Sequence, residues 1–245
     1  MKPILQQRVP AEMCHAPRLP GAAPCAPDDW LRVDDVYEPQ MEYRVDLIAA
    51  HGPDVLYTPP QTLPVQRELL EAAIMQLPRL GFLIRPDHVI CPDGRAVPLC
   101  RDAPLWTLGH LVQEDLCLLE KRGEEHVLIA GVVCFPASWR LPDKAGKPLS
   151  DIHQPVTAYD AQMARRVQRL FDGVRVGRPL WRFNRLEYAD ADLYQPGLKI
   201  ENAPMPYLRS ERQCIFRLPI SGAVAFSIHT WVTLNEPRVN ENAQL

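Results

Sequence analysis

The chain has 245 residues, 47% of them hydrophobic, and a formal net charge of −3. This length and hydrophobic content suffice to bury one large core, which excludes an intrinsically disordered chain. The small acidic excess argues against nucleic-acid binding, because no basic surplus exists to displace counterions from phosphates.

The sequence predicts a cytoplasmic protein that does not enter a membrane. Its longest apolar run, 127–135, is too short to span a bilayer, and residues 1–8 lack the apolar segment of a signal peptide. The seven cysteines contain no C-x-x-C pair, which argues against a disulfide framework, a zinc ribbon or a ferredoxin-type iron–sulfur cluster. G-x-G-x-x-G, P-loop and G-x-S-x-G motifs are also missing, so no standard nucleotide or serine-hydrolase site is indicated.

Proline is concentrated near the N-terminus, and residues 1–64 are interpreted as an extended arm that wraps around the rest of the chain. Within this arm, Tyr43 to Ala50 predict one short helix. Regular patterning begins at Val65. We therefore expect one domain over residues 65–236, followed by a C-terminal tail over residues 237–245.

Apolar residues at helical spacing predict three helices in that domain. The first spans residues 65–77, before a proline, and the third spans residues 158–171. The second is expected over residues 105–119, where leucines recur on one side. Its polar side is expected to turn three residues toward water: Gln113, Glu114 and Glu120.

Strand patterns are most frequent in the last third of the chain. A hairpin is predicted around the turn residues 92–94, and the run 127–135 lacks alternation, which is typical of a strand covered on both faces. Further strands are expected at residues 180–188, 213–218 and 223–232, the last two joined by a hairpin. Helices first and antiparallel strands later indicate an α+β fold.

His153 is the first candidate site residue, in a Pro-bounded turn shortly after the apolar strand. Neutral imidazole is the commonest protein ligand for iron, and a histidine on a short helix facing a curved sheet suits haem with one axial protein ligand. A capping or surface role is the alternative. His229, in a later strand, is interpreted as a core histidine with its hydrogen bonds satisfied.

Charged residues inside strands are the second informative feature. By strand alternation, Arg182 and Asn184 share one face, and Glu187 lies on the other. Arg212 lies in the next strand, on the face that carries Cys214. A buried guanidinium is costly unless it meets a carboxylate or a ligand. The pattern therefore predicts either ordinary salt bridges, to Glu187 or Glu211, or a polar ligand pocket over one face of the sheet.

Six motifs in the same order resemble those of the haem-dependent oxidative N-demethylase family. They lie at residues 111–119, 133–139, 144–146, 152–156, 181–184 and 210–219. The resemblance extends from about Tyr37 to Leu234, most of the chain.

The resemblance implies a PAS-like antiparallel sheet with flanking helices, which binds haem b, an iron porphyrin. Such a protein oxidises a small secondary amine, dimethylamine being the family's known substrate. It uses O2 and electrons from a separate flavin and iron–sulfur reductase. By motif, His153 would be the proximal iron ligand, and Lys144 and Trp139 would lie near the haem edge. Four residues would be candidates for the polar distal side: Arg182, Asn184, Glu187 and Arg212.

One position departs from the family pattern, because Arg185 follows Asn184 where a tryptophan is expected. A cation in place of a bulky neutral ring could change the pocket, and with it the substrate. The alternative function is a haem-binding PAS-like gas or redox sensor, or a non-catalytic subunit. A sensor would usually carry a coiled-coil signalling helix, and the sequence contains no heptad run.

Overall fold

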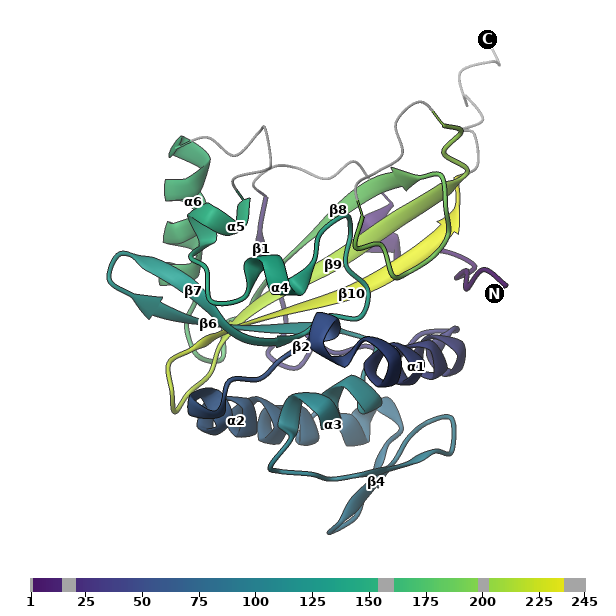
Figure 1. Ribbon diagram of the computed structural model, residues 1–245, viewed down its shortest axis with the longest axis horizontal. Coiled ribbons are helices and arrows are strands. Elements are labelled where there is room, and N and C mark those ends of the chain that lie inside the picture. The colour runs from purple at the N-terminus through teal and green to yellow at the C-terminus, as the bar shows by residue number, and fades with distance from the viewer. Residues whose placement is uncertain (1, 15–20, 154–160, 198–202, 236–245) are drawn as a thin grey trace.

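The computed structural model describes residues 2–14, 21–153, 161–197 and 203–235. Its centre is a seven-stranded antiparallel sheet in the order β1-β8-β9-β10-β6-β7-β2 (Figure 1). The strands are β1 (Ala23–Pro24), β2 (Leu56–Tyr57), β6 (Asp115–Arg122), β7 (Glu125–Val132), β8 (Leu180–Tyr188), β9 (Tyr207–Arg217) and β10 (Val224–Leu234). A second, three-stranded sheet contains β3 (Leu83–Ile84), β4 (His88–Ile90) and β5 (Ala96–Pro98).

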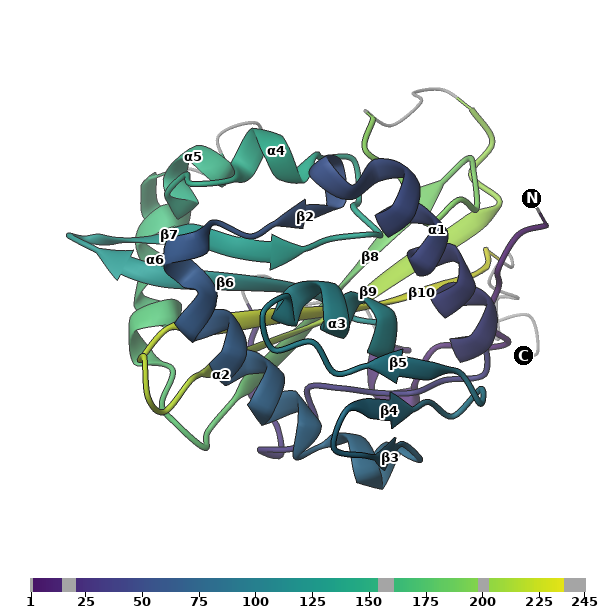
Figure 2. The same ribbon diagram turned by 60° about the horizontal axis from the view of Figure 1, so that its bottom comes forward.

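Helices cover both faces of the large sheet (Figures 1 and 2). One face, called here the α1 face, is covered by α1 (Tyr37–Val55), α2 (Leu63–Ile74) and α3 (Pro104–Leu111). The opposite face, called the α5 face, is covered by α4 (Leu141–Lys144), α5 (Leu149–His153) and α6 (Ala161–Gly173). Short 3-10 turns occur at η1 (Ala11–Met13), η2 (Pro60–Thr62) and η3 (Leu77–Leu80).

Alternation along the strands divides the core in two. In β6, Leu116 and Leu118 belong to the apolar cluster under α1–α3, whereas Cys117 and Leu119 belong to the cluster under α4–α6. Successive side chains in a strand point to opposite faces, so a strand buried on both sides needs an uninterrupted apolar sequence. Strand β7 has this pattern and is buried from His126 to Val132, which confirms the expectation for that run.

The large antiparallel sheet with flanking helices confirms the mixed α and β composition expected from the sequence. Helix α2, the β4–β5 hairpin and the three late strands lie close to their predicted positions. Residues 158–160 of the predicted third helix fall outside the described residues, and α6 begins at Ala161. The PAS-like assignment and the domain boundaries at residues 64 and 236 stay predictions.

The helix expected over residues 105–119 is wrong in its second half. Helix α3 ends at Leu111, the chain becomes extended at Val112, and β6 starts at Asp115. Of the three residues expected to face water, only Glu120 does, because Gln113 and Glu114 are 0% and 1% exposed. Their side chains bind segments far away in the sequence, which local periodicity cannot reveal.

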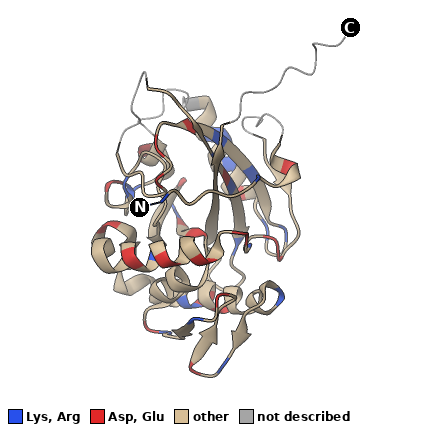
Figure 3. Cartoon of the chain, turned by 90° about the vertical axis from the view of Figure 1, so that its right-hand side faces the viewer, with Lys and Arg blue, Asp and Glu red and all other residues tan. Residues whose placement is uncertain are grey.

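The N-terminal region is also more regular than expected. Helix α1 covers 19 residues rather than the predicted 43–50, and it is kinked at His51, two residues before Pro53. Glu38, Glu42 and Asp46 recur at every fourth position and are exposed, giving α1 an acidic outer stripe (Figure 3). The opposite side of α1 is buried in the core, so Tyr37–Val55 packs as a core helix.

Helix α1 is fastened to the sheet by a buried ion pair. Arg44 donates to Asp115 Oδ1 at 2.7 Å, and the two side chains are 0% and 2% exposed. Arg44 also donates to three main-chain carbonyls around the end of α3 and the start of β6. Asp115 accepts two main-chain N–H groups after β7, at 2.8 and 2.9 Å. This pair therefore joins α1, α3, β6 and the end of β7 at one point.

No helix in the described part of the chain combines the length and the apolar character needed to cross a bilayer.

Replacing Asp115 by alanine should lower the free energy of unfolding by about 3–5 kcal/mol, because the Arg44 charge stays buried without its partner. Asp102→Ala is the matched control, since it breaks the exposed Arg67–Asp102 pair, whose side chains are 45% and 85% exposed. That loss should cost less than about 1 kcal/mol. Urea denaturation of both variants measures the difference, and equal costs would contradict the role given to Asp115.

Candidate haem site

Two short helices between β7 and α6 build the α5-face site. Helix α4 begins with a proline in its first turn, a position where the missing N–H costs nothing. The chain then turns back at Gly146, which adopts a φ of +73°, and the Gly146 N–H donates to the Leu128 carbonyl of β7 at 2.9 Å. The glycine thereby places α5 over the sheet, where Leu149 and Ile152 pack in the same cluster as Ile215.

His153 is the last residue of α5 and is partly buried. Its Nδ1 lies 2.8 Å from the Leu149 carbonyl, which can only accept, so Nδ1 carries the proton and Nε2 the lone pair. Metal-ligating histidines usually fix the ring in this way, by donating the other N–H to a backbone carbonyl. Burial lowers the pKa of His153, and the charges of Lys144 and Arg182 lower it further. The imidazole is thus held neutral, as an iron ligand must be.

Lys144 and Trp139 lie close to the end of α5 that carries His153. The Lys144 ammonium donates to the Ile152 carbonyl, next to His153, and lies 5.9 Å from the centroid of the Trp139 ring. Burial lowers the pKa of Lys144. The structure therefore brings together the three residues that the resemblance placed at the iron and near the haem edge.

Strands β8 and β9 contribute polar side chains to the same face. Arg182 is paired in register with Gln213, and Asn184 with Glu211, so all four point to one side of the sheet. Arg182 Nη1 donates to Gln213 Oε1 at 3.2 Å, and Asn184 Nδ2 donates to Glu211 Oε2 at 2.9 Å. Leu180 and Ile215, on the same face of β8 and β9, pack in one cluster with Ile152 of α5, so these four polar side chains lie on the face that α5 covers.

Arg182 is only partly satisfied. Among the described residues it donates to one acceptor, the neutral amide of Gln213, and its buried Nε has none. Burial accordingly lowers the pKa of Arg182, although the Glu211 carboxylate raises it in part. A half-satisfied guanidinium is a group that can still donate to a ligand.

Glu211 is the site residue that the sequence did not single out, since it was considered only as a salt-bridge partner. Its side chain is 6% exposed. The carboxylate accepts from Arg209 Nε at 3.1 Å, from Asn184 and from Gln213 Nε2 at 3.3 Å. Only the register of β8 against β9 places it opposite Asn184, and no local signal in the sequence gives that register.

Arg212 and Glu187 lie on the other side of the sheet, which corrects the expectation that they share the pocket with Arg182. Arg212 is paired in register with Phe183 and therefore points to the α1 face. Its Nη2 donates to Asp29 Oδ2 at 2.7 Å, and its guanidinium lies 5.1 Å from the centroid of the Trp181 ring. Glu187 is exposed, and because it follows Phe183 by four residues in β8, it points to the same face as Phe183.

Arg185 also points to the α1 face. Its Nη2 donates to the Met13 carbonyl of η1 at 2.8 Å. The departure from the family pattern at this position therefore changes a contact with the N-terminal segment and leaves the α5-face residues as they are.

The donor set fits a haem. In the described residues no three His, Cys, Asp or Glu side chains gather as a metal ion held by protein alone would require. A porphyrin supplies four of the iron ligands itself and needs one histidine from the protein. His153, with its anchored Nδ1 and neutral ring, meets that requirement, and Trp139, Ile152 and Leu180 supply apolar surface in the same cluster.

Comparison with known protein families matches residues 21–242 to the family described as haem-dependent oxidative N-demethylase, alpha subunit-like. The chain belongs to this family. The match confirms the resemblance carried by the six sequence motifs, and it includes β1 and α1, which precede the first of them. The family's haem dependence also agrees with the donor set around His153 in this N-demethylase alpha subunit-like chain.

Replacing Arg182 by leucine should change the free energy of unfolding by less than about 1 kcal/mol, because this arginine has one neutral partner and leucine keeps the apolar packing. Arg212→Leu, the matched control one strand away, should cost on the order of 2 kcal/mol, because it breaks an ion pair and a carbonyl contact to Asp29. Denaturation curves of the two variants measure the contrast. A large loss for Arg182→Leu alone would make Arg182 a structural residue.

Proposed function

We propose that this chain is the haem-binding, oxygen-using component of an oxidative N-demethylase that acts on a small secondary amine. The family match supports the oxidoreductase class, and the anchored His153 imidazole is the observation that carries the proposal to this chain's own residues. When bound, haem b supplies the redox chemistry of O2 activation, while the protein supplies placement and polarity.

In this proposal, His153 Nε2 holds the iron from α5, and Lys144 and Trp139 lie along the haem edge. Arg182 and Asn184 reach the ligand from the sheet. With haem bound, the Arg182 guanidinium would be a hydrogen-bond donor for O2 and would stabilise negative charge on it, a contact that is stronger in a site shielded from water. The incomplete hydrogen bonding of Arg182 supports this assignment.

Glu211, rather than Glu187, would hold the amine. Asn184, Gln213 and Arg209 fix its carboxylate in one orientation on the α5 face. A secondary amine is a cation at neutral pH and would be placed by charge-assisted hydrogen bonds to Glu211. Oxidation of its N-methyl carbon then balances as follows: amine, O2, two electrons and two protons give the demethylated amine, formaldehyde and one water. The two electrons come from a separate flavin and iron–sulfur reductase, as the family resemblance implies.

The His153→Ala variant of the haem-supplied protein should lose the Soret absorption band or release haem readily, because no other described side chain replaces the imidazole in this position. His88→Ala is the matched control, since His88 lies on β4 in the small sheet and is bonded to Asp87. Haem content per chain and the absorption spectrum are the measurements. Unchanged haem content in His153→Ala would remove this residue from the iron.

Glu211→Gln should weaken amine binding at least tenfold, about 1.4 kcal/mol, and leave haem content unchanged, because the amide keeps the shape but loses the charge. Glu187→Gln, on the exposed opposite face, should leave amine binding as it is. Perturbation of the haem spectrum by dimethylamine measures the affinity. Equal loss of haem and amine binding in Glu211→Gln would show that the carboxylate is structural.

A turnover assay distinguishes the proposed enzyme from the alternative, a haem-binding sensor. Reduced protein supplied with O2, a chemical reductant and dimethylamine should release formaldehyde. Binding of O2 or CO without formaldehyde would favour a sensor or a non-catalytic subunit.

A further inference from the structure

Helix α6 and the loop that follows it concentrate positive charge in a chain whose net charge is −3. Residues 161–178 contain five arginines and one acidic residue, Asp172, which is paired with Lys121 of β6 at 2.7 Å. The arginines are Arg165, Arg166, Arg169, Arg175 and Arg178. All five are exposed, and none forms an ion pair within the described residues. Together they are called here the arginine surface.

The pattern of α6 places its arginines on the outer side of the helix. Val167, Leu170 and Phe171 pack in the apolar cluster of the α5 face. Arg165 and Arg169 are one helical turn apart, on the side away from that cluster. The packing of α6 against the sheet therefore fixes the direction in which this charge faces.

The loop after α6 is fastened to the sheet. Arg217 of β9 donates to the Val174 carbonyl at 2.7 Å and to the Phe171 carbonyl at 2.9 Å, which also satisfies the end of the helix. The Arg178 N–H donates to the Arg175 carbonyl at 3.0 Å across a tight turn. Arg175 and Arg178 are thus presented on a backbone that needs little ordering when a partner binds.

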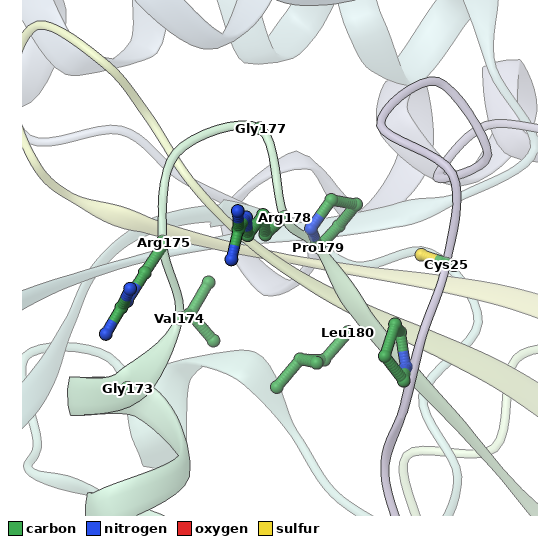
Figure 4. A pocket seen from close by; sticks show the side chains of 9 residues that line it. Cys25, Gly173, Val174, Arg175, Gly177, Arg178, Pro179 and Leu180 are labelled. Atoms are coloured by element: carbon green, nitrogen blue, oxygen red, sulfur yellow. The ribbon is translucent and has the colours of Figure 1, made fainter.

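Apolar surface accompanies the arginines. Val176, at the tip of the loop, is 51% exposed. An open-sided cavity of about 480 Å³ lies beside the loop, lined by Val174 and Leu180 as well as by Arg175 and Arg178 (Figure 4). Protein–protein interfaces are enriched in arginine and depleted in lysine, and the segment from α6 through this loop contains no lysine. These features are typical of a protein-binding surface.

Negative charge gathers on the other side of the molecule. Glu38, Glu42 and Asp46 form the acidic outer stripe of α1, and α1 and α6 lie at opposite sides of the structure (Figures 1 and 2). Such a separation of charge orients an approaching charged protein before contact. An acidic protein is attracted to the arginine surface, whereas a nucleic acid would meet one short positive segment on a chain that is negative as a whole.

The arginine surface lies next to the candidate haem site. Leu149 and Ile152 of α5 share one apolar cluster with Val167 and Phe171 of α6, and the two helices are neighbours over the same face (Figure 1). His153 directly follows Ile152 at the end of α5. A protein bound to α6 would therefore be close to a haem held by His153.

We propose that the arginine surface is the docking site for an acidic electron-donor protein. This inference rests on the proposed function, which consumes two electrons per amine oxidised, and the sequence has no nucleotide-binding or ferredoxin-type motif of its own. In each encounter one electron passes from a reduced iron–sulfur cluster of the partner to ferric haem, and the oxidised partner leaves. The contact is accordingly transient and mainly electrostatic.

The test uses an acidic plant-type ferredoxin, immobilised for biolayer interferometry against the full-length, haem-supplied protein. The protein should bind, and raising NaCl from about 20 to about 300 mM should weaken binding about tenfold or more, because salt screens exposed charges. Arg165→Glu combined with Arg169→Glu should weaken binding about tenfold or more at the lower salt concentration. This double substitution exchanges one like-charge pair at i and i+4 for another, so α6 should stay folded.

Arg8→Glu combined with Arg85→Glu is the matched control. Both arginines are exposed and lie outside the arginine surface, and the control changes the net charge by the same amount. Its affinity for ferredoxin should stay within about twofold of that of the unaltered protein.

Haem reduction gives a second measurement. Ferredoxin that is reduced beforehand and freed of dithionite should reduce the haem under CO, and the ferrous–CO Soret band reports the rate. The band should form about tenfold more slowly in the Arg165→Glu, Arg169→Glu variant than in the control. Dithionite alone should reduce all three proteins at the same rate, because a small reductant needs no docking site.

Equal weakening in the two double variants would overturn the docking site, because net charge alone would then explain the effect. The absence of ferredoxin binding, binding that salt does not change, or tighter binding of a DNA duplex than of ferredoxin would overturn it as well. A protein that takes up no haem would instead overturn the proposed function. The interferometry would still decide the docking site in that case, so the two failures are distinguishable.

Discussion

The alternation of side chains along β8, β9 and β10 is the constraint on which the candidate haem site depends. These strands carry an unusual number of charged residues for a central sheet, and each residue must point to one face or the other. Arg182, Asn184 and Glu211 point to the α5 face, where His153 ends a short helix. Arg212 points to the α1 face, where it holds the N-terminal segment through Asp29. Shifting the register of β8 against β9 by one residue would exchange these roles completely.

On the α1 face, buried charged groups form ion pairs. His229 of β10 lies between Glu114 at 2.8 Å and Asp34 at 3.2 Å. Burial by itself would lower the pKa of His229, but the two carboxylates raise it to about 9, and the same contacts lower the pKa of Asp34 to about 2. Such a buried imidazolium with two acidic partners fixes the chain before α1 against the sheet, and its loss would leave charges buried. The sequence interpretation of His229 as a satisfied core histidine is confirmed.

On the α5 face, Arg182 donates one hydrogen bond among the described residues, and its buried Nε has no acceptor. Arg44 and Arg209 bind both carboxylates and carbonyls, whereas Arg182 donates to one neutral amide. Arg182 differs from Arg209 and Arg212, the buried arginines of the sheet, in having no carboxylate partner among the described residues, which leaves its charge available to a ligand. The family match names the ligand class as haem. The α1 face thus carries the ion pairs Arg212–Asp29 and His229 with Asp34 and Glu114, and the α5 face carries the candidate haem ligand His153.

The sequence by itself determined the family, the late antiparallel strands, the helical turn at His153 and the opposite orientation of Asn184 and Glu187. These follow from motifs or from the two-residue period within one strand, which are local properties. Only the tertiary structure decided that β6 replaces the second half of a predicted helix, because Leu116 and Leu119 fit a helical spacing as well as a strand. It also decided that Glu211 faces Asn184 and that Arg212 meets Asp29, 183 residues away. Register and long-range ion pairs depend on which distant segments share a face, and no local pattern contains that information.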